Sequence, residues 1–171
     1  MQTYKLVLLG DAGVGKTSLL RRVASKEFKK SYQATFAAEI SGLQITETTT
    51  LIVWDCAGNP NFGSNCGEHY LNSDAALVMF DLTSFATFKR VVHFMTAFRR
   101  KARDAVIILC GTKSDLGRSR QVTLDDINKF CTALGLTYFE TSAKEDDHCD
   151  LPFLEVVKQL TERSAANAAK L

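Results

Sequence analysis

Short apolar runs alternate with longer segments of mixed polarity along this chain. Each run has the length of a strand, several are rich in branched side chains, and together they cover residues 4–9, 50–55, 76–81, 105–111 and 136–141. Near-continuous apolarity over such a length is typical of strands that are covered on both faces. The pattern therefore predicts strands in the interior of a sheet.

The segments between the runs carry helical patterns. They cover residues 16–26, 85–101, 123–134 and 151–164. Thr123 precedes Asp125 and Asp126, so we expect it to be the N-cap of the third helix. Strands that alternate with helices predict an α/β fold with a mostly parallel sheet and helices on both faces.

Segment 38–46 differs from the other strands in how it is connected. A short polar turn at Glu47 and Thr48 joins it to the run at 50–55. Such a connection suits a hairpin, so the segment is expected to be an antiparallel edge strand. The expected sheet then has six strands. The alanine-rich end of the chain is expected to be either a fraying helix tail or the cut edge of a longer protein.

Composition limits the size, the partners and the compartment. A chain of 171 residues with 46% hydrophobic residues is long enough for one domain, which we expect to span residues 1–171. The formal net charge of +2, without a long basic block, favours neither nucleic acid nor an anionic membrane as a partner. Five cysteines without paired metal-ligand spacing fit a reducing compartment. Without a membrane span or signal peptide, a soluble cytoplasmic protein is expected, with association with the nucleus or a membrane left open. We also expect a monomer.

The most specific motif is GDAGVGKT, from Gly10 to Thr17. Two glycines lie four residues apart and are followed by lysine and threonine, directly after a predicted strand and at the start of a predicted helix. This is the phosphate-loop pattern, in which backbone N–H groups and a helix N-terminus face phosphate groups. We expect Lys16 to reach the outer phosphates and the Thr17 hydroxyl to bind Mg²⁺.

Two further motifs indicate which base the nucleotide carries. GTKSD, from Gly111 to Asp115, and ETSAK, from Glu140 to Lys144, each follow a predicted strand. Asp115 can accept hydrogen bonds from the ring N–H and the amino group of guanine, whereas adenine offers no such adjacent pair. Ligands bind at the carboxyl ends of strands in open α/β sheets, so the two loops are expected to converge there. An adenine-nucleotide phosphotransferase on the same phosphate loop is the disfavoured alternative.

These motifs, in this order and spacing, resemble the Ras superfamily of small GTPases over nearly the whole chain. Within the superfamily the chain is most similar to the Ran and Rab branches, and segments such as EFKKSYQAT, MFDLTSFATFKRV and PFLEVVKQL together resemble Ran more than any one Rab. The resemblance implies a GDP/GTP switch in vesicular or nucleocytoplasmic transport, with GTP or GDP and Mg²⁺ as its cofactors. It also implies that effectors, exchange factors and GTPase-activating proteins bind the loops around 30–40 and 58–72. Membrane anchoring is not supported by this chain.

The resemblance carries over to individual positions. Phe28 would pack against the guanine base, the backbone N–H of Gly58 would sense the γ-phosphate, and that of Ala143 would meet the guanine oxygen. Thr17, Thr35 and Asp55 would hold Mg²⁺, and Lys16, Thr35 and Asn59 would take part in catalysis. The full expected nucleotide site is Asp11, Ala12, Gly13, Val14, Gly15, Lys16, Thr17, Ser18, Phe28, Tyr32, Thr35, Gly58, Thr112, Lys113, Asp115, Ser142, Ala143 and Lys144.

Asn59 departs from the pattern of the family, which usually has glutamine at this position. The glutamine amide orients the attacking water against the γ-phosphate. Asparagine is shorter by one methylene, so its reach falls by ~1.5 Å, and a misplacement of about 1 Å can cost ~10²-fold in rate. Pro60 further restricts the backbone of Asn59. We therefore expect slow intrinsic hydrolysis. The alternative is a GTP-binding interaction module with little or no hydrolysis.

Overall fold

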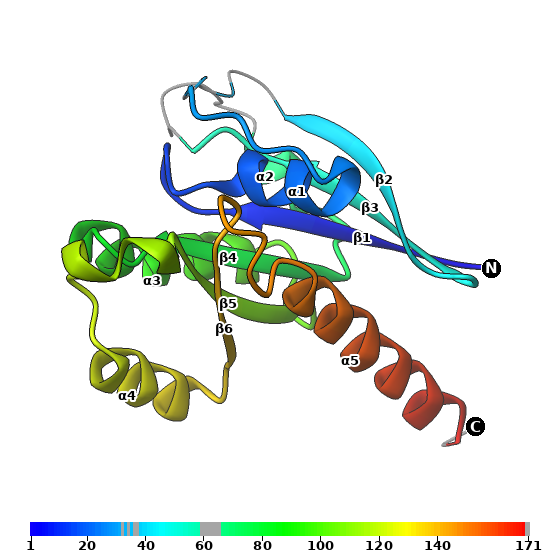
Figure 1. Ribbon diagram of the computed structural model, residues 1–171. Coiled ribbons are helices and arrows are strands. Elements are labelled where there is room, and N and C mark those ends of the chain that lie inside the picture. Colours follow the sequence, from blue (N-terminus) through cyan, green and yellow to red (C-terminus); the bar gives the residue numbers. More distant parts are fainter. Residues whose placement is uncertain (32, 34, 36–37, 59–65, 170–171) are drawn as a thin grey trace.

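Six strands form one sheet in the order β2-β3-β1-β4-β5-β6 (Figure 1). The computed structural model describes residues 1–31, 33, 35, 38–58 and 66–169. The strands are β1 (Gln2–Leu9), β2 (Glu39–Thr46), β3 (Thr49–Asp55), β4 (Ala75–Asp81), β5 (Val106–Thr112) and β6 (Thr137–Thr141). The helices are α1 (Lys16–Ser25), α2 (Cys66–His69), α3 (Phe85–Arg99), the 3₁₀ helix η2 (Ser114–Ser119), α4 (Leu124–Leu134) and α5 (Leu151–Ala168).

Strand direction sets the edge at which loops meet. β1 pairs in parallel with β3 and β4, and β4, β5 and β6 continue the parallel order. β2 pairs antiparallel with β3. The carboxyl ends of β1, β3, β4, β5 and β6 therefore lie along the same edge of the sheet, and the loops after them can surround one ligand.

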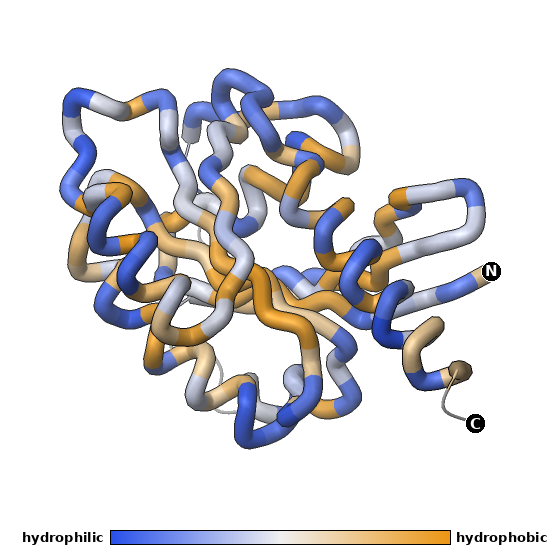
Figure 2. Tube along the Cα trace, turned by 90° about the horizontal axis from the view of Figure 1, so that it is seen from below, coloured by the Kyte–Doolittle hydropathy of each residue, from blue (hydrophilic) through white to orange (hydrophobic). Residues whose placement is uncertain are grey.

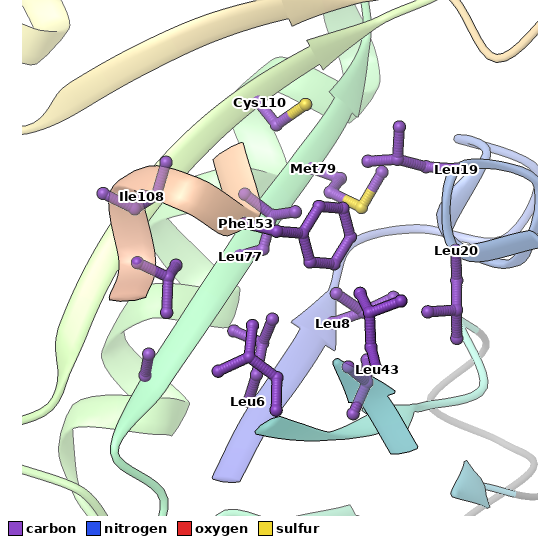
Figure 3. Packing of buried hydrophobic residues seen from close by; sticks show 14 of the residues in the cluster. Leu6, Leu8, Leu19, Leu20, Leu43, Leu77, Met79, Ile108, Cys110 and Phe153 are labelled. Atoms are coloured by element: carbon purple, nitrogen blue, oxygen red, sulfur yellow. The ribbon is translucent and has the colours of Figure 1, made fainter. Parts of the chain in front are cut away.

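Alternate residues of the strands enter two hydrophobic cores, one on each face. Leu6 and Leu8 of β1 are fully buried with residues of α1 and α5, and Phe153 of α5 points among them (Figure 3). Val7 belongs to the second core, which holds Phe80 and residues of α3 and α4. The hydropathy view shows the apolar residues concentrated along the central strands (Figure 2). Both faces are thus covered, as the near-continuous apolar runs predict.

The expected fold class is confirmed, including the antiparallel edge strand. The main difference concerns the last helix, which continues to Ala168 instead of ending at residue 164. Alanine has the highest helix propensity, so the alanine-rich segment extends the helix. Helices α2 and η2 were not expected, because segments of four and six residues are too short to carry an amphipathic period.

The start of α4 confirms the expected cap. The backbone N–H of Asp126 donates to Thr123 Oγ1 at 3.1 Å, and the backbone N–H of Thr123 donates to Asp126 Oδ2 at 3.2 Å. This reciprocal pair is a capping box, which satisfies two backbone donors that the helix leaves open.

Thr123→Ala should lower the free energy of unfolding by about 1 kcal/mol, because it removes the cap acceptor. Urea denaturation followed by far-UV circular dichroism measures the change. Thr132→Ala is the matched control, since Thr132 is exposed in the last turn of the same helix, far from the cap. Equal stabilities of the two variants would contradict the role of the cap.

Candidate functional site

A cavity of about 490 Å³ opens at the carboxyl edge of the sheet. Its walls come from the loops after β1, β5 and β6 and from the segment after α1. This volume suits a small organic ligand. The expected site residues that line it are Ala12, Gly13, Gly15, Lys16, Thr17, Ser18, Phe28, Thr35, Gly58, Thr112, Lys113, Asp115, Ala143 and Lys144.

The phosphate loop places a buried cation against the N-terminus of α1. Gly15 is the N-cap of this helix with φ of 103°, a left-handed conformation that side chains rarely adopt. Lys16 is only 6% exposed, and its Nζ donates to the carbonyl oxygens of Gly10 at 2.9 Å and Asp11 at 3.0 Å. Burial lowers the pKa of Lys16, because desolvation disfavours its charged form. An anionic ligand here would gain from both the ammonium group and the helix N-terminus.

Three side-chain oxygens gather beside Lys16. Thr17 Oγ1 lies 3.0 Å from Thr35 Oγ1 and donates to Asp55 Oδ2 at 2.5 Å. Asp55 is 1% exposed, and its Oδ1 has no hydrogen-bond partner among the described residues. Burial raises the pKa of Asp55, although the hydrogen bond from Thr17 opposes the shift. A buried carboxylate oxygen without a partner is costly, which marks this place as one that a ligand would complete.

The donor set fits Mg²⁺. This ion prefers oxygen ligands and is usually bound by one or two carboxylates together with substrate phosphates. Asp55 supplies a carboxylate, and Thr17 and Thr35 supply hydroxyl groups close to it. Within the described part of the chain, no group of three or more His, Cys, Asp or Glu side chains could hold a metal ion. A cation at this place would need further oxygen ligands, which water or a ligand phosphate could supply.

Gly58 brings the loop after β3 into contact with the phosphate loop. A β-carbon at Gly58 would overlap the backbone nitrogen of Ala12, so no side chain fits there without a backbone shift. The backbone of Gly58 thus lies directly against the phosphate loop, where its N–H can approach a phosphate group.

One end of the cavity, where the sequence predicts that the base binds, is built on Asp115, and we call it the base end. Ser142 Oγ donates to Asp115 Oδ1 at 2.7 Å, and the backbone N–H of Glu145 donates to Ser142 Oγ at 3.1 Å. Lys144 Nζ lies 4.0 Å from Asp115 Oδ2. These contacts fix the orientation of the carboxylate that the sequence assigns to the base.

Thr112 and Lys113, which come shortly before Asp115, connect the base end to neighbouring elements. Thr112 Oγ1 lies 2.5 Å from the carbonyl oxygen of Val14 and 3.0 Å from that of Phe80, so its hydroxyl links β5 to the phosphate loop. Lys113 has φ of 61°, and its Nζ pairs with Asp81 Oδ2 at 2.6 Å. The phosphate end and the base end are therefore mechanically connected.

Some expected site residues do not line the cavity. Val14 is 1% exposed within the core beneath the phosphate loop, and Ser142 lies behind Asp115. The carboxylate of Asp11 pairs with Arg90 of α3 at 3.1 Å. Burial raises the pKa of Asp11, and the Arg90 guanidinium opposes that shift. Tyr32 and Asn59 fall outside the described residues.

The sequence motifs missed part of the cavity wall. The additional lining residues are Leu19, Arg21, Lys29, Lys30, Ser31, Gln33, Leu116 and Thr141. Lys29, Lys30, Ser31 and Gln33 come shortly after Phe28, and this closeness in sequence to an expected site residue was the available signal. Thr141 lies within ETSAK and Leu116 directly follows GTKSD, but the motifs did not show that their side chains line the cavity, because that depends on how the loops after β5 and β6 converge.

Comparison with known proteins gives two findings. The model of the Ras family matches residues 5–162. The chain is 35% identical over 161 residues to Ras-related protein Rab-11A of Dictyostelium discoideum, an alignment that covers 92% of this chain and 75% of that protein. Among the described residues, no helix is both long enough and apolar enough to cross a membrane.

Lys16→Ala should abolish tight GDP binding, because it removes the buried cation of the phosphate loop. The far-UV circular dichroism should remain native, since we assign Lys16 to the ligand and not to the core. Lys129→Ala, at an exposed lysine of α4, is the control for loss of one positive charge. Unchanged GDP affinity in Lys16→Ala, measured by isothermal titration calorimetry, would contradict the assignment.

Asp115→Asn should lower the affinity for GDP by at least about tenfold, because the base loses one charged hydrogen-bond acceptor. It should also shift the preference toward xanthosine diphosphate (XDP), in which a C2 carbonyl group replaces the amino donor of guanine with an acceptor. Competition binding of GDP against XDP measures both changes, with Asp125→Asn on the exposed face of α4 as control. The base assignment fails if XDP gains nothing relative to GDP.

Proposed function

The chain belongs to the Ras family of small GTPases, and from this premise we propose that it is a GDP/GTP switch in vesicular or nucleocytoplasmic transport. The observation that carries the proposal is that groups of three complementary chemistries lie in or directly behind the wall of one cavity. Buried Lys16 suits phosphate, and Asp115 held by Ser142 suits guanine. Asp55 does not line the cavity itself, but it accepts a hydrogen bond from Thr17, which does, and its Oδ1, without a partner among the described residues, suits a divalent cation. The chain length and the family match support a single GTPase domain over residues 1–171.

Lys16 and the amino end of α1 would bind the outer phosphates of the nucleotide. Thr17, Thr35 and Asp55 would hold Mg²⁺, which when bound neutralises phosphate charge as it develops. The buried Oδ1 of Asp55 supports this role, because it faces no protein donor among the described residues. Phe28 and Asp115, both in the cavity wall, would hold the base.

The switch itself would depend on Thr35 and Gly58. Both lie against the phosphate loop, Thr35 through the Thr17 hydroxyl and Gly58 through the backbone at Ala12. A γ-phosphate would give each of them one further partner, and hydrolysis would remove it. Effectors and regulators would then read the state of the nucleotide through the loops around 30–40 and 58–72.

Hydrolysis is proposed to be slow because of Asn59. The argument rests on side-chain length, since the amide must reach a water at the γ-phosphate. Ala12 adds a methyl group near the space that a partner's arginine would enter, and it lies in the cavity wall. The second candidate, favoured by the same two residues, is a GTP-binding interaction module that scarcely hydrolyses its ligand.

We further propose a cytoplasmic location and a monomeric state. Cys110, Cys131 and Cys149 are thiols and form no disulfides, as expected in a reducing compartment. Burial raises the pKa of the Cys110 thiol to about 12, which keeps it protonated and unreactive at neutral pH.

Nucleotide binding tests the proposal directly. Purified protein should bind GDP and GTP tightly in the presence of Mg²⁺, and ATP should fail to displace fluorescent GDP at comparable concentrations. Displacement by ATP as effective as that by GTP would contradict guanine specificity and favour the phosphotransferase alternative.

Asn59→Gln should accelerate intrinsic hydrolysis by about tenfold to ~10²-fold, because the longer amide restores the reach toward the attacking water. Single-turnover hydrolysis, started by adding Mg²⁺ to the GTP complex, separates this step from nucleotide binding. Asn128→Gln makes the same chemical change at an exposed position of α4 and should have no effect. Equal rates for wild type and Asn59→Gln would mean that the shorter amide is not the limitation.

A further inference from the structure

Arg22 lies in the last turn of α1 and does not line the cavity. Its guanidinium nevertheless contacts two segments that do. Nε donates to the carbonyl oxygen of Ala143 at 2.6 Å, and Nη2 donates to that of Lys144 at 3.2 Å. Nη1 donates to the carbonyl oxygen of Lys26 at 2.7 Å. One side chain thus connects the end of α1 to the loop between β6 and α5, which lies beside α1 (Figure 1).

The first of these segments forms the base end of the cavity. Ala143 and Lys144 line the cavity and directly follow Ser142, the residue that holds Asp115. A shift of their backbone would move both the N–H of Ala143 and the hydroxyl of Ser142. The hydrogen bonds from Arg22 therefore act on the groups that are expected to read guanine.

The second segment leads to the other wall of the base site. Lys26 is the C-cap of α1 in a left-handed conformation, and Phe28 follows two residues later. The guanidinium carbon of Arg22 lies 5.9 Å from the centroid of the Phe28 ring, within the range of a cation–π contact. Arg22 thus contacts the Phe28 wall as well as the loop opposite it.

The loop after β6 needs such external support. Asp146 and His148 both have positive φ, of 55° and 53°, which costs energy for residues other than glycine. Inside the loop, Ser142 and Asp147 exchange two backbone hydrogen bonds of 3.0 Å. Lys26 adds a longer and more exposed ion pair to Asp146 at 3.8 Å. Arg22 contributes the shorter contacts to the side of the loop that faces the cavity.

We propose that Arg22 is a positioning residue that sets both walls of the base site and thereby supports guanine selectivity. The inference rests on the proposed function, since it assumes that guanine occupies this end of the cavity. The planar guanidinium presents several N–H groups in a fixed arrangement, so it can serve three carbonyl oxygens in different directions. A lysine ammonium is a single point of charge and cannot reproduce that arrangement.

A simpler role would be stabilisation of the C-terminus of α1, where a basic residue interacts favourably with the last carbonyl groups. The two roles differ in what they change. A helix cap affects the stability of the fold and leaves base discrimination intact. A positioning residue affects the preference for guanine over adenine.

The test compares Arg22→Met, Arg22→Lys and wild type in the rate of GDP release and in the affinity ratio of GDP to ADP. Arg22→Met should release GDP about tenfold faster and lose a similar factor of selectivity, because hydrogen bonds from a charged donor are lost at the loop. The affinity for ADP should fall less, since adenine offers neither the adjacent donor pair for Asp115 nor a carbonyl oxygen for the N–H of Ala143. Arg22→Lys should recover only part of the selectivity.

Arg99→Met is the matched control. Arg99 also donates to two backbone carbonyls, those of Arg103 at 2.7 Å and Ala105 at 2.6 Å, but it lies at the end of α3 and does not line the cavity. The Arg99→Met variant should have a lower melting temperature and an unchanged affinity ratio of GDP to ADP. If Arg22→Met does not fold, Arg22→Lys decides by the same ratio.

The outcomes separate this inference from the proposed function. Wild-type protein that fails to bind GDP would contradict the proposed function and, with it, the role of Arg22. Tight wild-type binding with an unchanged selectivity in the folded Arg22 variants would contradict only the role of Arg22, and would assign the residue to the cap of α1.

Discussion

Two opposite charges buried at one edge of a parallel sheet are the constraint on which this structure depends. Lys16 is 6% exposed and Asp55 is 1% exposed, and desolvation disfavours the charged form of each. Main-chain carbonyls and the Thr17 hydroxyl compensate them in part. One oxygen of Asp55 remains without a protein partner within the described part of the chain. A phosphate group for Lys16 and a divalent cation for Asp55 would complete the compensation.

The rest of the fold holds these charges in register with the base end. β1 lies between β3 and β4, so the loop that carries Lys16 and the strand that ends at Asp55 are neighbours. The Thr112 hydroxyl connects the phosphate loop to the strand that leads to Asp115. Arg22 connects the other end of α1 to the loop beyond β6. Phosphate binding and base recognition are thus supported by one continuous set of contacts.

The sequence predicted most of the fold because its signals are local. The apolar runs, the cap at Thr123 and the glycines of the phosphate loop each lie within a few residues, and each was found where expected. Contacts between distant segments gave no comparable signal. In the sequence Arg22 is an ordinary basic residue of an amphipathic helix. Only the folded structure shows that it donates a hydrogen bond to the loop at Ala143. Val14 and Ser142 belong to the motifs but support the cavity from behind, which spacing alone does not distinguish.

The central claim is that phosphate and a divalent cation together compensate the buried charges, and the rate of GDP release tests it most directly. Fluorescent GDP bound to the wild-type protein is chased with excess GDP, once with Mg²⁺ in millimolar excess and once with EDTA. The account predicts slow release with Mg²⁺ and release at least about tenfold faster with EDTA, because a cation held by Asp55 and Thr17 would neutralise part of the phosphate charge. Equal release rates in the two buffers would contradict it.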